Sequence, residues 1–269
     1  MKEIANSQEL KTIQLDILKF VDKFCKEKGI RYFLSGGTLL GAIRHKGFIP
    51  WDDDIDIMML RVDYERFVEE FSDTSNCRYS VHTFKKDNNF YYTFAQISDD
   101  NTFLIEEVNY PYTKSGVNID LFPIDYLPEN EVEIKRLFAY VNKWRTLWTL
   151  KNVRISRSRN FGKNLILFIS RILLFFIPNK IFIQRILNKV EFLKNIRTSK
   201  SGVVVAGYGI KEVLDSLSFD DVFMVDFEGF KFPAPKGYDA YLKSLYGDYM
   251  QLPPKEKRIT HHAFKAYWK

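Results

Sequence analysis

Cysteine is nearly absent from this sequence of 269 residues, which contains only Cys25 and Cys77. A disulfide framework or a cysteine-ligated metal site requires several cysteines, usually at close spacing. Two cysteines this far apart offer no such spacing. The composition therefore indicates a reducing compartment and gives no cysteine-based metal site.

A long apolar run is missing as well. The stretch from Leu165 to Ile177 is nearly all apolar but has only 13 residues, with Arg171 inside it and Pro178 after it. A membrane-spanning helix needs about 20 apolar residues. Residues Met1 to Leu10 are too polar and acidic for a secretory signal. No internal repeat or low-complexity tract occurs, so we expect a cytoplasmic chain with one sizeable core or a core plus a smaller helical part.

Acidic residues are scarce in one region, residues 151 to 200, which hold 12 Lys and Arg against the single acid Glu191. Basic flanks around an apolar stretch fit a helix that lies in the surface of an anionic membrane, where each basic residue adds about 1 kcal/mol. The alternative is a buried core helix with a solvated basic neighbour. A nucleic-acid binder is a third interpretation, since the sequence pI is about 9.0. The interleaved apolar run and the lack of an RNA-binding aromatic motif argue against it, so no nucleic acid is expected.

A glycine turn marks the first candidate site. Residues Ile30 to Leu34 predict a short strand that runs into Gly36 and Gly37, and residues Thr38 to His45 predict a helical turn behind it. Glycines let the backbone approach a phosphate closely, and a helix N-terminus favours its charge. Ser35 to Thr38 therefore predict an anion cradle, although a simple tight turn would have the same sequence.

An acidic strand follows in Asp54-Ile55-Asp56-Ile57. Side chains alternate along a strand, so the two aspartates are expected on one face and the two isoleucines on the other. Two carboxylates at this spacing repel each other unless a hard cation or solvent accommodates them, and Mg²⁺ or Mn²⁺ would suit them. A solvated loop is the plainer alternative.

A third carboxylate is predicted from Val117 to Phe122, an apolar strand with Asp120 in its middle. If this strand lies beside the acidic one, Asp120 would complete a metal triad or take the proton from an attacking hydroxyl. A structural, hydrogen-bonded aspartate is the alternative. Asp125 is interpreted as a turn or cap residue.

Changes in composition predict how the chain is organised. Ser7 is expected to cap a helix that Gly29 ends, and the turn near Pro128 to Asn130 separates a strand-rich half from a helical one. We predict a catalytic core in residues 1–127, a basic and apolar helical insertion in 130–200, and a C-terminal part, 201–269, that completes the core. Residues Val203 to Val205, between glycines, suggest a short strand and turn.

The quoted motifs resemble the LicD family of phosphocholine transferases. The similarity is carried by Gly36 to His45 with Ile49 to Ile57, and it extends to Asp63–Phe67, Asn118–Pro123, Tyr246–Met250, Leu252–Pro254, Lys257–Arg258 and His261–His262. This resemblance implies an α/β (α+β) nucleotidyltransferase-like core with a short mixed sheet, related to fukutin and fukutin-related protein. The interval between Gly37 and Asp54 is long for a typical nucleotidyltransferase, but the LicD pattern shares it.

The resemblance also implies roles for particular residues. Asp54 and Asp56 would bind Mg²⁺ (or Mn²⁺), with Asp52 and Asp120 as further ligands. Trp51 would stack on the cytosine, face the choline or serve as a packing anchor. Phosphate contacts would come from the basic residues Arg44, His45, Lys46, Lys257, Arg258, His261 and His262. The candidates for a choline cage are Tyr91, Tyr92, Tyr110 and Tyr112, although tyrosines at such spacing are more often found on strand faces.

The activity that the resemblance implies is metal-dependent transfer of phosphocholine from CDP-choline to a sugar hydroxyl, with release of CMP. The acceptor would be a lipid-linked precursor of a cell-surface glycan, lipopolysaccharide or teichoic acid, which would place the protein on the inner face of the cell membrane. Other branches would move glycerol phosphate, ribitol phosphate or a sugar phosphate. A catalytically silent membrane scaffold is the remaining alternative, and it leaves the acidic strand unexplained.

Overall fold

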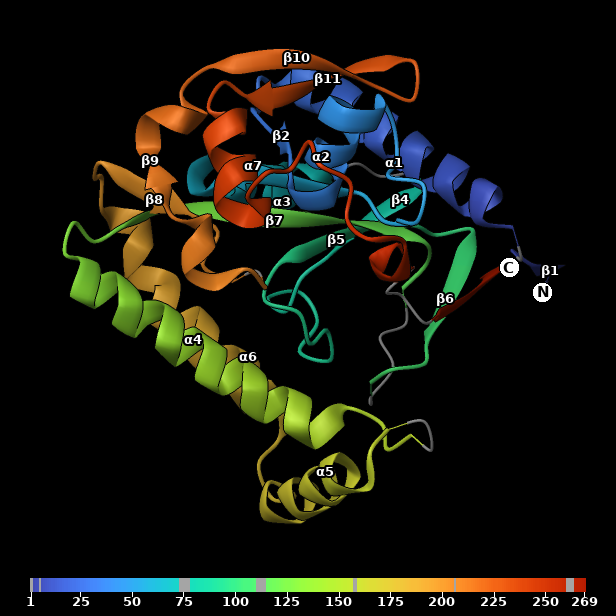
Figure 1. Ribbon diagram of the computed structural model, residues 1–269, viewed down its shortest axis with the longest axis vertical. Coiled ribbons are helices and arrows are strands. Elements are labelled where there is room, and N and C mark those ends of the chain that lie inside the picture. Colours follow the sequence, from blue (N-terminus) through green and yellow to red (C-terminus); the bar gives the residue numbers. More distant parts are fainter. Residues whose placement is uncertain are drawn as a thin grey trace.

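A mixed sheet of seven strands lies at the centre of the molecule in the computed structural model, which describes residues 2–4, 6–72, 78–109, 115–156, 159–205, 207–259 and 264–269 (Figure 1). Its strands are β2 (Phe33–Leu34), β3 (Asp56–Leu60), β4 (Tyr79–His82), β5 (Ala95–Asp99), β7 (Asn118–Leu127), β8 (Lys200–Gly202) and β9 (Leu214–Asp215). The main path runs β2-β3-β7-β5-β4, with β8 and β9 continuing from β7. Only the pair β3 and β7 is parallel among these described strands. The mixed α/β class and the short mixed sheet are confirmed.

Helices α1 (Ser7–Lys28) and α3 (Arg61–Ser72) pack against each other and against β7. Their apolar faces meet through aromatic pairs, such as Phe24 against Phe67 with ring centroids 5.6 Å apart. The α1 helix ends at Gly29 with φ 61°, as predicted, but Asn6 rather than Ser7 is its cap, and the Asn6 side chain accepts from the Gln8 amide at 2.9 Å. This packing supports the strands of the sheet along one face.

Shorter elements surround the other edges of the sheet. Helix α2 (Gly36–His45) contacts β3, α7 (Tyr238–Tyr246) and the hairpin of β10 (Val222–Phe227) and β11 (Phe230–Pro235). The 3₁₀ turns are η1 (Glu191–Asn195), η2 (Gly209–Glu212), η3 (Ser216–Phe219) and η4 (Lys255–Lys257). The C-terminal third of the chain thus returns to the N-terminal sheet.

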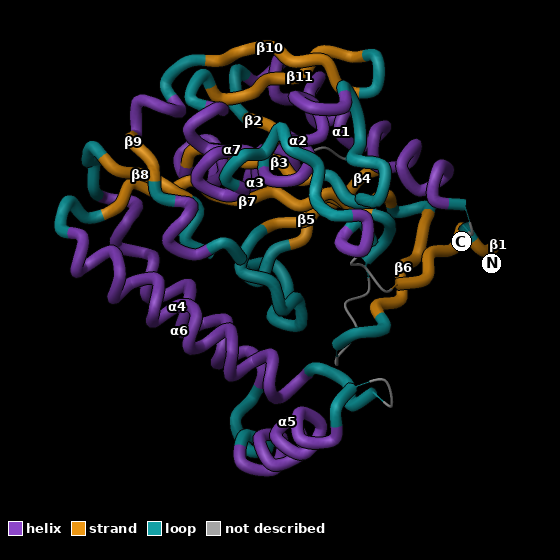
Figure 2. The backbone as a smooth tube through the Cα atoms, viewed as in Figure 1, coloured by secondary structure: helices purple, strands orange, loops and turns teal. Residues whose placement is uncertain are grey.

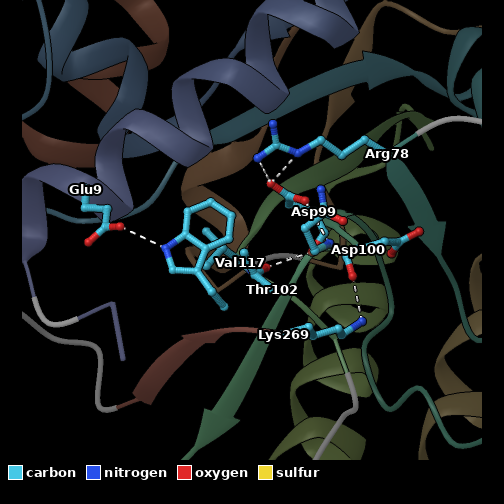
Figure 3. Close-up of polar contacts among 9 residues, drawn as sticks. Glu9, Arg78, Asp99, Asp100, Thr102, Val117 and Lys269 are labelled. Atoms are coloured by element: carbon cyan, nitrogen blue, oxygen red, sulfur yellow. Dashed lines mark hydrogen bonds and ion pairs between the residues drawn. The ribbon is translucent and has the colours of Figure 1, made fainter. Parts of the chain in front are cut away.

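A second sheet joins the two ends of the described chain. It has the order β1 (Lys2–Glu3), β12 (Phe264–Trp268) and β6 (Thr102–Glu106), and both pairings are antiparallel. Figure 3 shows the polar contacts around it: the Trp268 indole donates to Glu9 at 2.8 Å, and Lys269 Nζ donates to the Asp100 carbonyl at 2.7 Å. The Thr102 hydroxyl accepts from the Val117 amide at 2.7 Å. These contacts fix β12 against α1 and the β5–β6 turn.

Three helices form an extension that we call the helical arm: α4 (Glu131–Asn152), α5 (Phe161–Leu173) and α6 (Asn179–Val190). Helices α4 and α6 lie along each other, and α5 sits at the end of the arm away from the sheet (Figures 1 and 2). The arm follows the turn near Pro128 to Asn130, since β7 ends at Leu127 and α4 begins at Glu131, and the division into domains stays a prediction. The described helices include none that is long and apolar enough to cross a membrane.

Three expectations need correction. Asp125 is not a turn or cap residue, because it is fully buried within β7 and paired with Arg61. The strand expected at Val203 to Val205 lies earlier in the chain, as β8, which ends at Gly202. The three valines follow it and are buried. The apolar run, Leu165 to Ile177, does not coincide with one helix. Helix α5 begins before the run, at Phe161, and ends within it, at Leu173, and turns follow. The aspartate was misassigned because the sequence does not show its partner, 64 residues away.

Candidate active site

Asp56 and Asp120 lie opposite each other on neighbouring parallel strands. Asp56 opens β3, Asp120 lies in β7, and the two are register partners. The Asp120 amide donates to the Ile55 carbonyl at 2.9 Å, which fixes the alignment. The prediction that the Asp120 strand runs beside the acidic segment is therefore confirmed. Asp54 lies just before the start of β3 rather than inside a strand.

The glycine turn packs directly against these acids. Ser35 precedes α2, and its amide donates to the Asp56 carbonyl at 3.0 Å, while the Thr38 hydroxyl accepts from the Asp56 amide at 2.8 Å. Gly36 has φ 49°, and a Cβ added to it would lie 3.1 Å from Asp56 Oδ2. A Cβ on Gly37 would lie 2.7 Å from Asp52 Oδ2. The predicted order of strand, glycines and helix is confirmed, but the strand is only Phe33–Leu34 and α2 begins at Gly36, so the glycine turn is the first turn of the helix. The absence of side chains at both glycines lets the carboxylates approach the helix N-terminus.

The carboxylates influence one another strongly. Burial raises the pKa of Asp56 well above its usual range, and the negative charges of Asp54 and Asp120 raise it further. The Gln96 amide donates to Asp120 Oδ1 at 2.9 Å. Removing such groups from water while they repel one another disfavours their ionised forms, and a nearby cation would reverse that preference. The arrangement therefore has the electrostatics of a cation site.

The residue types fit a hard divalent cation, because carboxylate oxygens are its preferred protein ligands. Within the described part of the chain, however, no three His, Cys, Asp or Glu side chains converge as they do in a preformed metal site. Metal binding by the acids Asp52, Asp54, Asp56 and Asp120 therefore stays a prediction. A bound cation would have to draw these neighbouring side chains together.

A group of tyrosines and one acid, which sequence reasoning missed, lies behind the glycine turn. The hydroxyls of Tyr208 and Tyr246 are 2.8 Å apart, and Tyr246 reaches to 3.8 Å from a Cβ placed on Gly36. Tyr241 is fully buried, with its hydroxyl 3.1 Å from Ser35 Oγ. Burial raises the pKa of the adjacent Glu212 to about 8. Tyr246 opens one of the matched motifs, but no sequence signal connected Glu212 to the turn.

Several of the predicted phosphate-binding residues hold a loop in place. Arg44 donates through Nη1 to the Tyr249 carbonyl at 2.7 Å and through Nε to His45 at 2.9 Å. The Arg258 guanidinium lies 5.5 Å from the centre of the Trp51 ring, whose edge-on neighbour is His45 at 6.2 Å. This cluster attaches the segment after α7 to the end of α2. Phosphate binding by these side chains stays a prediction.

The remaining predicted basic residues are less constrained. Lys46 ends α2 with φ 61° and is exposed, and Lys257 in η4 is also exposed. His261 and His262 lie outside the described residues, as do Tyr110 and Tyr112. The structure therefore brings together the acids and the glycine turn and leaves the histidine pair unplaced.

A cavity of about 250 Å³ adjoins Asp54 and Asp120. We call it the Tyr92 cavity, and its lining includes Asp54, Tyr92, Gln96, Glu106, Asp120 and Phe264. The Tyr92 hydroxyl donates to Glu106 Oε1 at 2.5 Å. Sequence reasoning singled out Tyr92 as a residue to inspect but missed Gln96 and Glu106, because neither belongs to a motif. The site thus combines a glycine turn, an acidic centre and a neighbouring cavity.

Comparison with known proteins agrees with this geometry. Residues 29–165 match the family model described as LicD/FKTN/FKRP, nucleotidyltransferase domain. The chain is 32% identical to the lipopolysaccharide cholinephosphotransferase LicD of Haemophilus influenzae over 267 residues, which cover 97% of each chain. An uncharacterised protein of Rickettsia typhi is 27% identical over 50% of this chain and 41% of its own length.

A shorter part of the chain is similar to a human protein. Over 39 residues the chain is 49% identical to the ribitol 5-phosphate transferase FKRP of Homo sapiens, which covers 14% of this chain and 8% of that protein. The family model spans the glycine turn, the acidic segment and β7, and the bacterial relative matches nearly end to end. On both grounds, the chain belongs to the LicD family.

Proposed function

We propose that this protein transfers a phosphocholine group from CDP-choline to a sugar hydroxyl of a lipid-linked cell-surface glycan, with CMP as the second product. The observation that carries the proposal is the register pairing of Asp56 with Asp120 beside the glycine turn. The near full-length similarity to a lipopolysaccharide cholinephosphotransferase supports the choice of group. The core would be nucleotidyltransferase-like, in accordance with the description of the matched family.

We assign each part of the proposed reaction to particular residues. The acceptor oxygen attacks the phosphorus that carries the choline, the bond from that phosphorus to the oxygen of CMP breaks, and the hydroxyl proton passes to a carboxylate, for which Asp120 is our candidate. The amides at Gly36 and Gly37, at the N-terminus of α2, would bind phosphate oxygens. Asp52, Asp54 and Asp56 would hold Mg²⁺ or Mn²⁺. When bound, the metal would neutralise charge that develops on the leaving CMP.

The hydrogen bonds around Asp120 suit this role. Gln96 donates to Oδ1 of Asp120 at 2.9 Å and orients the carboxylate. The backbone pairing holds β7 at a fixed register against β3, so the proton acceptor stays at a constant distance from Asp56. Orientation of this kind lowers the barrier because less freedom is lost when the reacting atoms meet.

A ribitol phosphate donor is the second candidate, on the basis of the short similarity to FKRP. That similarity covers a small part of both proteins, whereas the cholinephosphotransferase matches along the whole chain. We therefore rank CDP-choline above CDP-ribitol and CDP-glycerol as the donor.

The proposal also places the helical arm at an anionic membrane surface, where a lipid-linked acceptor would be found. Helix α5 and the turn after it expose large apolar side chains, with Phe161 81% and Phe176 89% exposed. The other exposed apolar residues of this stretch are Leu165, Ile166, Phe168, Ile169, Ile172, Leu173 and Phe175. Lys163 and Lys180, both exposed, flank the surface with positive charge. Anionic lipid headgroups attract basic side chains, and the neighbouring apolar side chains can then enter the boundary between headgroups and acyl chains.

Part of the basic block has another role. Arg171 donates through Nη2 to the Val153 carbonyl at 2.9 Å, and Lys151 donates to the Ile177 carbonyl. These two residues fasten α5 to the end of α4. The membrane proposal therefore rests on the exposed lysines and the apolar surface.

The experiment that tests the transfer compares CDP-choline with CDP-ribitol, CDP-glycerol and CDP-ethanolamine, with and without Mg²⁺, in the presence of a lipopolysaccharide acceptor. We expect Mg²⁺-dependent CMP release from CDP-choline. Asp56→Asn should abolish release, whereas Asp221→Asn, which changes an exposed aspartate paired with Lys236, should leave it unchanged. Release only from another donor would overturn the choice of substrate.

A further inference from the structure

The Tyr92 cavity has an unusual balance of charge. Among the residues that the structure describes, its lining contains four carboxylates, those of Asp53, Asp54, Glu106 and Asp120, and no Lys, Arg or His side chain. Asp54 and Asp120 lie at the acidic centre, whereas Glu106 comes from β6 in the second sheet. A pocket that is negative and lacks a basic side chain repels phosphate groups and attracts cations.

An aromatic ring stands beside Glu106. Tyr92 donates its hydroxyl to Glu106, and both burial and the neighbouring carboxylate raise the pKa of Tyr92, so the phenol stays neutral. The ring is packed between Phe90 and Phe94, with centroids 5.3 and 5.1 Å away. Phe264 and Leu104 add apolar surface to the same lining. The carboxylate and ring are thus fixed in place before any ligand arrives.

The lining also contains two buried amide side chains. Gln14 is 4% exposed and Gln96 is 6% exposed, both line the cavity, and the Oε1 atom of each has no hydrogen-bond partner among the described residues. The Gln14 and Gln96 amino groups, by contrast, are already bonded, to the Asn118 carbonyl and to Asp120. The open positions are hydrogen-bond acceptors. A buried acceptor without a partner is costly, so a ligand that presents a hydrogen-bond donor or positive charge would be favoured.

We infer that the Tyr92 cavity binds the quaternary ammonium group of the donor, with Glu106 supplying charge and Tyr92 an aromatic surface. Aromatic rings attract quaternary ammonium groups, and the attraction grows when water is excluded. The inference rests on the proposed function, since it assigns the choline end of the donor to this cavity and the phosphates to the glycine turn. A neutral polyol such as ribitol would donate hydrogen bonds to these acceptors, but it would bring no positive charge to the four carboxylates.

The test measures binding rather than turnover. Isothermal titration with Mg²⁺ present would compare phosphocholine with 3,3-dimethylbutyl phosphate, in which carbon replaces the charged nitrogen at the same shape. We expect the wild-type protein to bind phosphocholine about tenfold or more tightly than the neutral compound, which corresponds to the loss of one favourable charge interaction. Glu106→Gln should remove most of this preference.

Matched variants control for indirect effects. Glu107→Gln changes the next residue, an exposed acid that pairs with Lys265 outside the cavity, and should keep the preference. Tyr92→Phe keeps the ring and should retain most of it, whereas Tyr92→Leu should weaken phosphocholine binding about fivefold or more. If Glu106→Gln does not fold, as judged by its circular dichroism, the Tyr92→Leu result decides.

The outcomes separate the two proposals. Equal binding of the charged and neutral compounds by the wild-type protein overturns the ammonium assignment, even if CMP is released from CDP-choline. A preference that Glu106→Gln and Tyr92→Leu leave intact overturns it as well. A preference that both variants reduce supports the ammonium assignment. Because this test measures binding, that result would hold even if the acceptor assay showed no transfer.

Discussion

The Thr38 hydroxyl accepts a hydrogen bond from the Asp56 amide at 2.8 Å, and this bond ties the first turn of α2 to the start of β3. Thr38 is buried, so its replacement by valine would leave the Asp56 amide without this acceptor. We expect Thr38→Val to lower kcat about tenfold and stability by about 1–3 kcal/mol, because a buried donor without a partner is costly. Thr38→Ser keeps the hydroxyl and should restore both, as measured by CMP release and urea denaturation. Full activity of Thr38→Val would contradict the positioning role.

A methyl group at Gly36 should damage the site more than its small size suggests. Its Cβ would lie 3.1 Å from Asp56 Oδ2, on a residue with φ 49°. A left-handed conformation costs a non-glycine residue about 1–2 kcal/mol. We expect Gly36→Ala to raise the donor KM and to lower kcat in steady-state assays.

The control for this change is Gly207→Ala, because a Cβ at Gly207 would meet no atom within 4 Å. That variant should behave like the wild-type protein. Equal effects of the two substitutions would show that the glycine turn is not specifically required.

Arg61 and Asp125 form a bidentate pair at the centre of the fold. Nε and Nη2 of Arg61 each donate to Asp125 at 2.7 Å, and the Asp125 side chain is fully buried. Removing one partner leaves the other charge buried and uncompensated, which typically costs 3–5 kcal/mol. We expect Asp125→Ala to lower the free energy of unfolding by about that amount in guanidinium denaturation. Asp221→Ala, in an exposed pair with Lys236, should change it little.

Glu212 should make stability depend on pH. Its pKa is about 8 in the folded protein, because burial disfavours the charged form, and near 4.5 when exposed. Between these values the folded state binds a proton that the unfolded state has lost, so stability falls as pH rises from about 4.5 to 8. The fall is about 1.4 kcal/mol per pH unit at most.

Glu212→Gln mimics the protonated acid and should abolish this slope. Denaturation of both proteins at pH 5.5 and pH 7.5 would measure the difference, which should be larger at pH 7.5. Parallel pH profiles would mean that the Glu212 carboxyl is not held in its neutral form.

The exposed surface of α5 should determine binding to membranes. Replacing Phe168, Ile172 and Phe176 by serine removes apolar area that faces solvent, and we expect this triple variant to sediment poorly with anionic vesicles. Phe223→Ser, on the exposed hairpin strand β10, is the control and should sediment normally. Binding by the wild-type protein should weaken with salt, because the contribution of the lysines is screened. Equal sedimentation of the triple variant and the wild-type protein would exclude α5 as the contact.

The acidic centre was predictable because its signals are local. Alternation in Asp54 to Ile57 and a single acid in the apolar strand around Asp120 predict two neighbouring strands. The structure pairs them, although the first begins only at Asp56. The glycine turn was predictable for the same reason, since Gly36 and Gly37 come just after a strand and open the following helix. The family followed from the motifs themselves.

The rest depends on contacts between distant segments. Nothing near Asp125 shows that Arg61 will meet it, and nothing near Glu212 indicates that Tyr241 will bury it beside the glycine turn. Glu106 has no motif, and only the folded structure brings it to Tyr92. Sequence periodicity identifies elements, whereas these partners are selected by how the elements pack.

The Tyr92 cavity takes its walls from residues as far apart as Leu10 and Phe264. Strands β3 and β7 precede the helical arm, so a growing chain on the ribosome has both acidic strands well before β12 emerges. Domains generally begin to fold during synthesis, from the N-terminal side. The acidic centre would therefore assemble early in translation, and the pocket beside it would close only when the strand bearing Phe264 takes its place between β1 and β6.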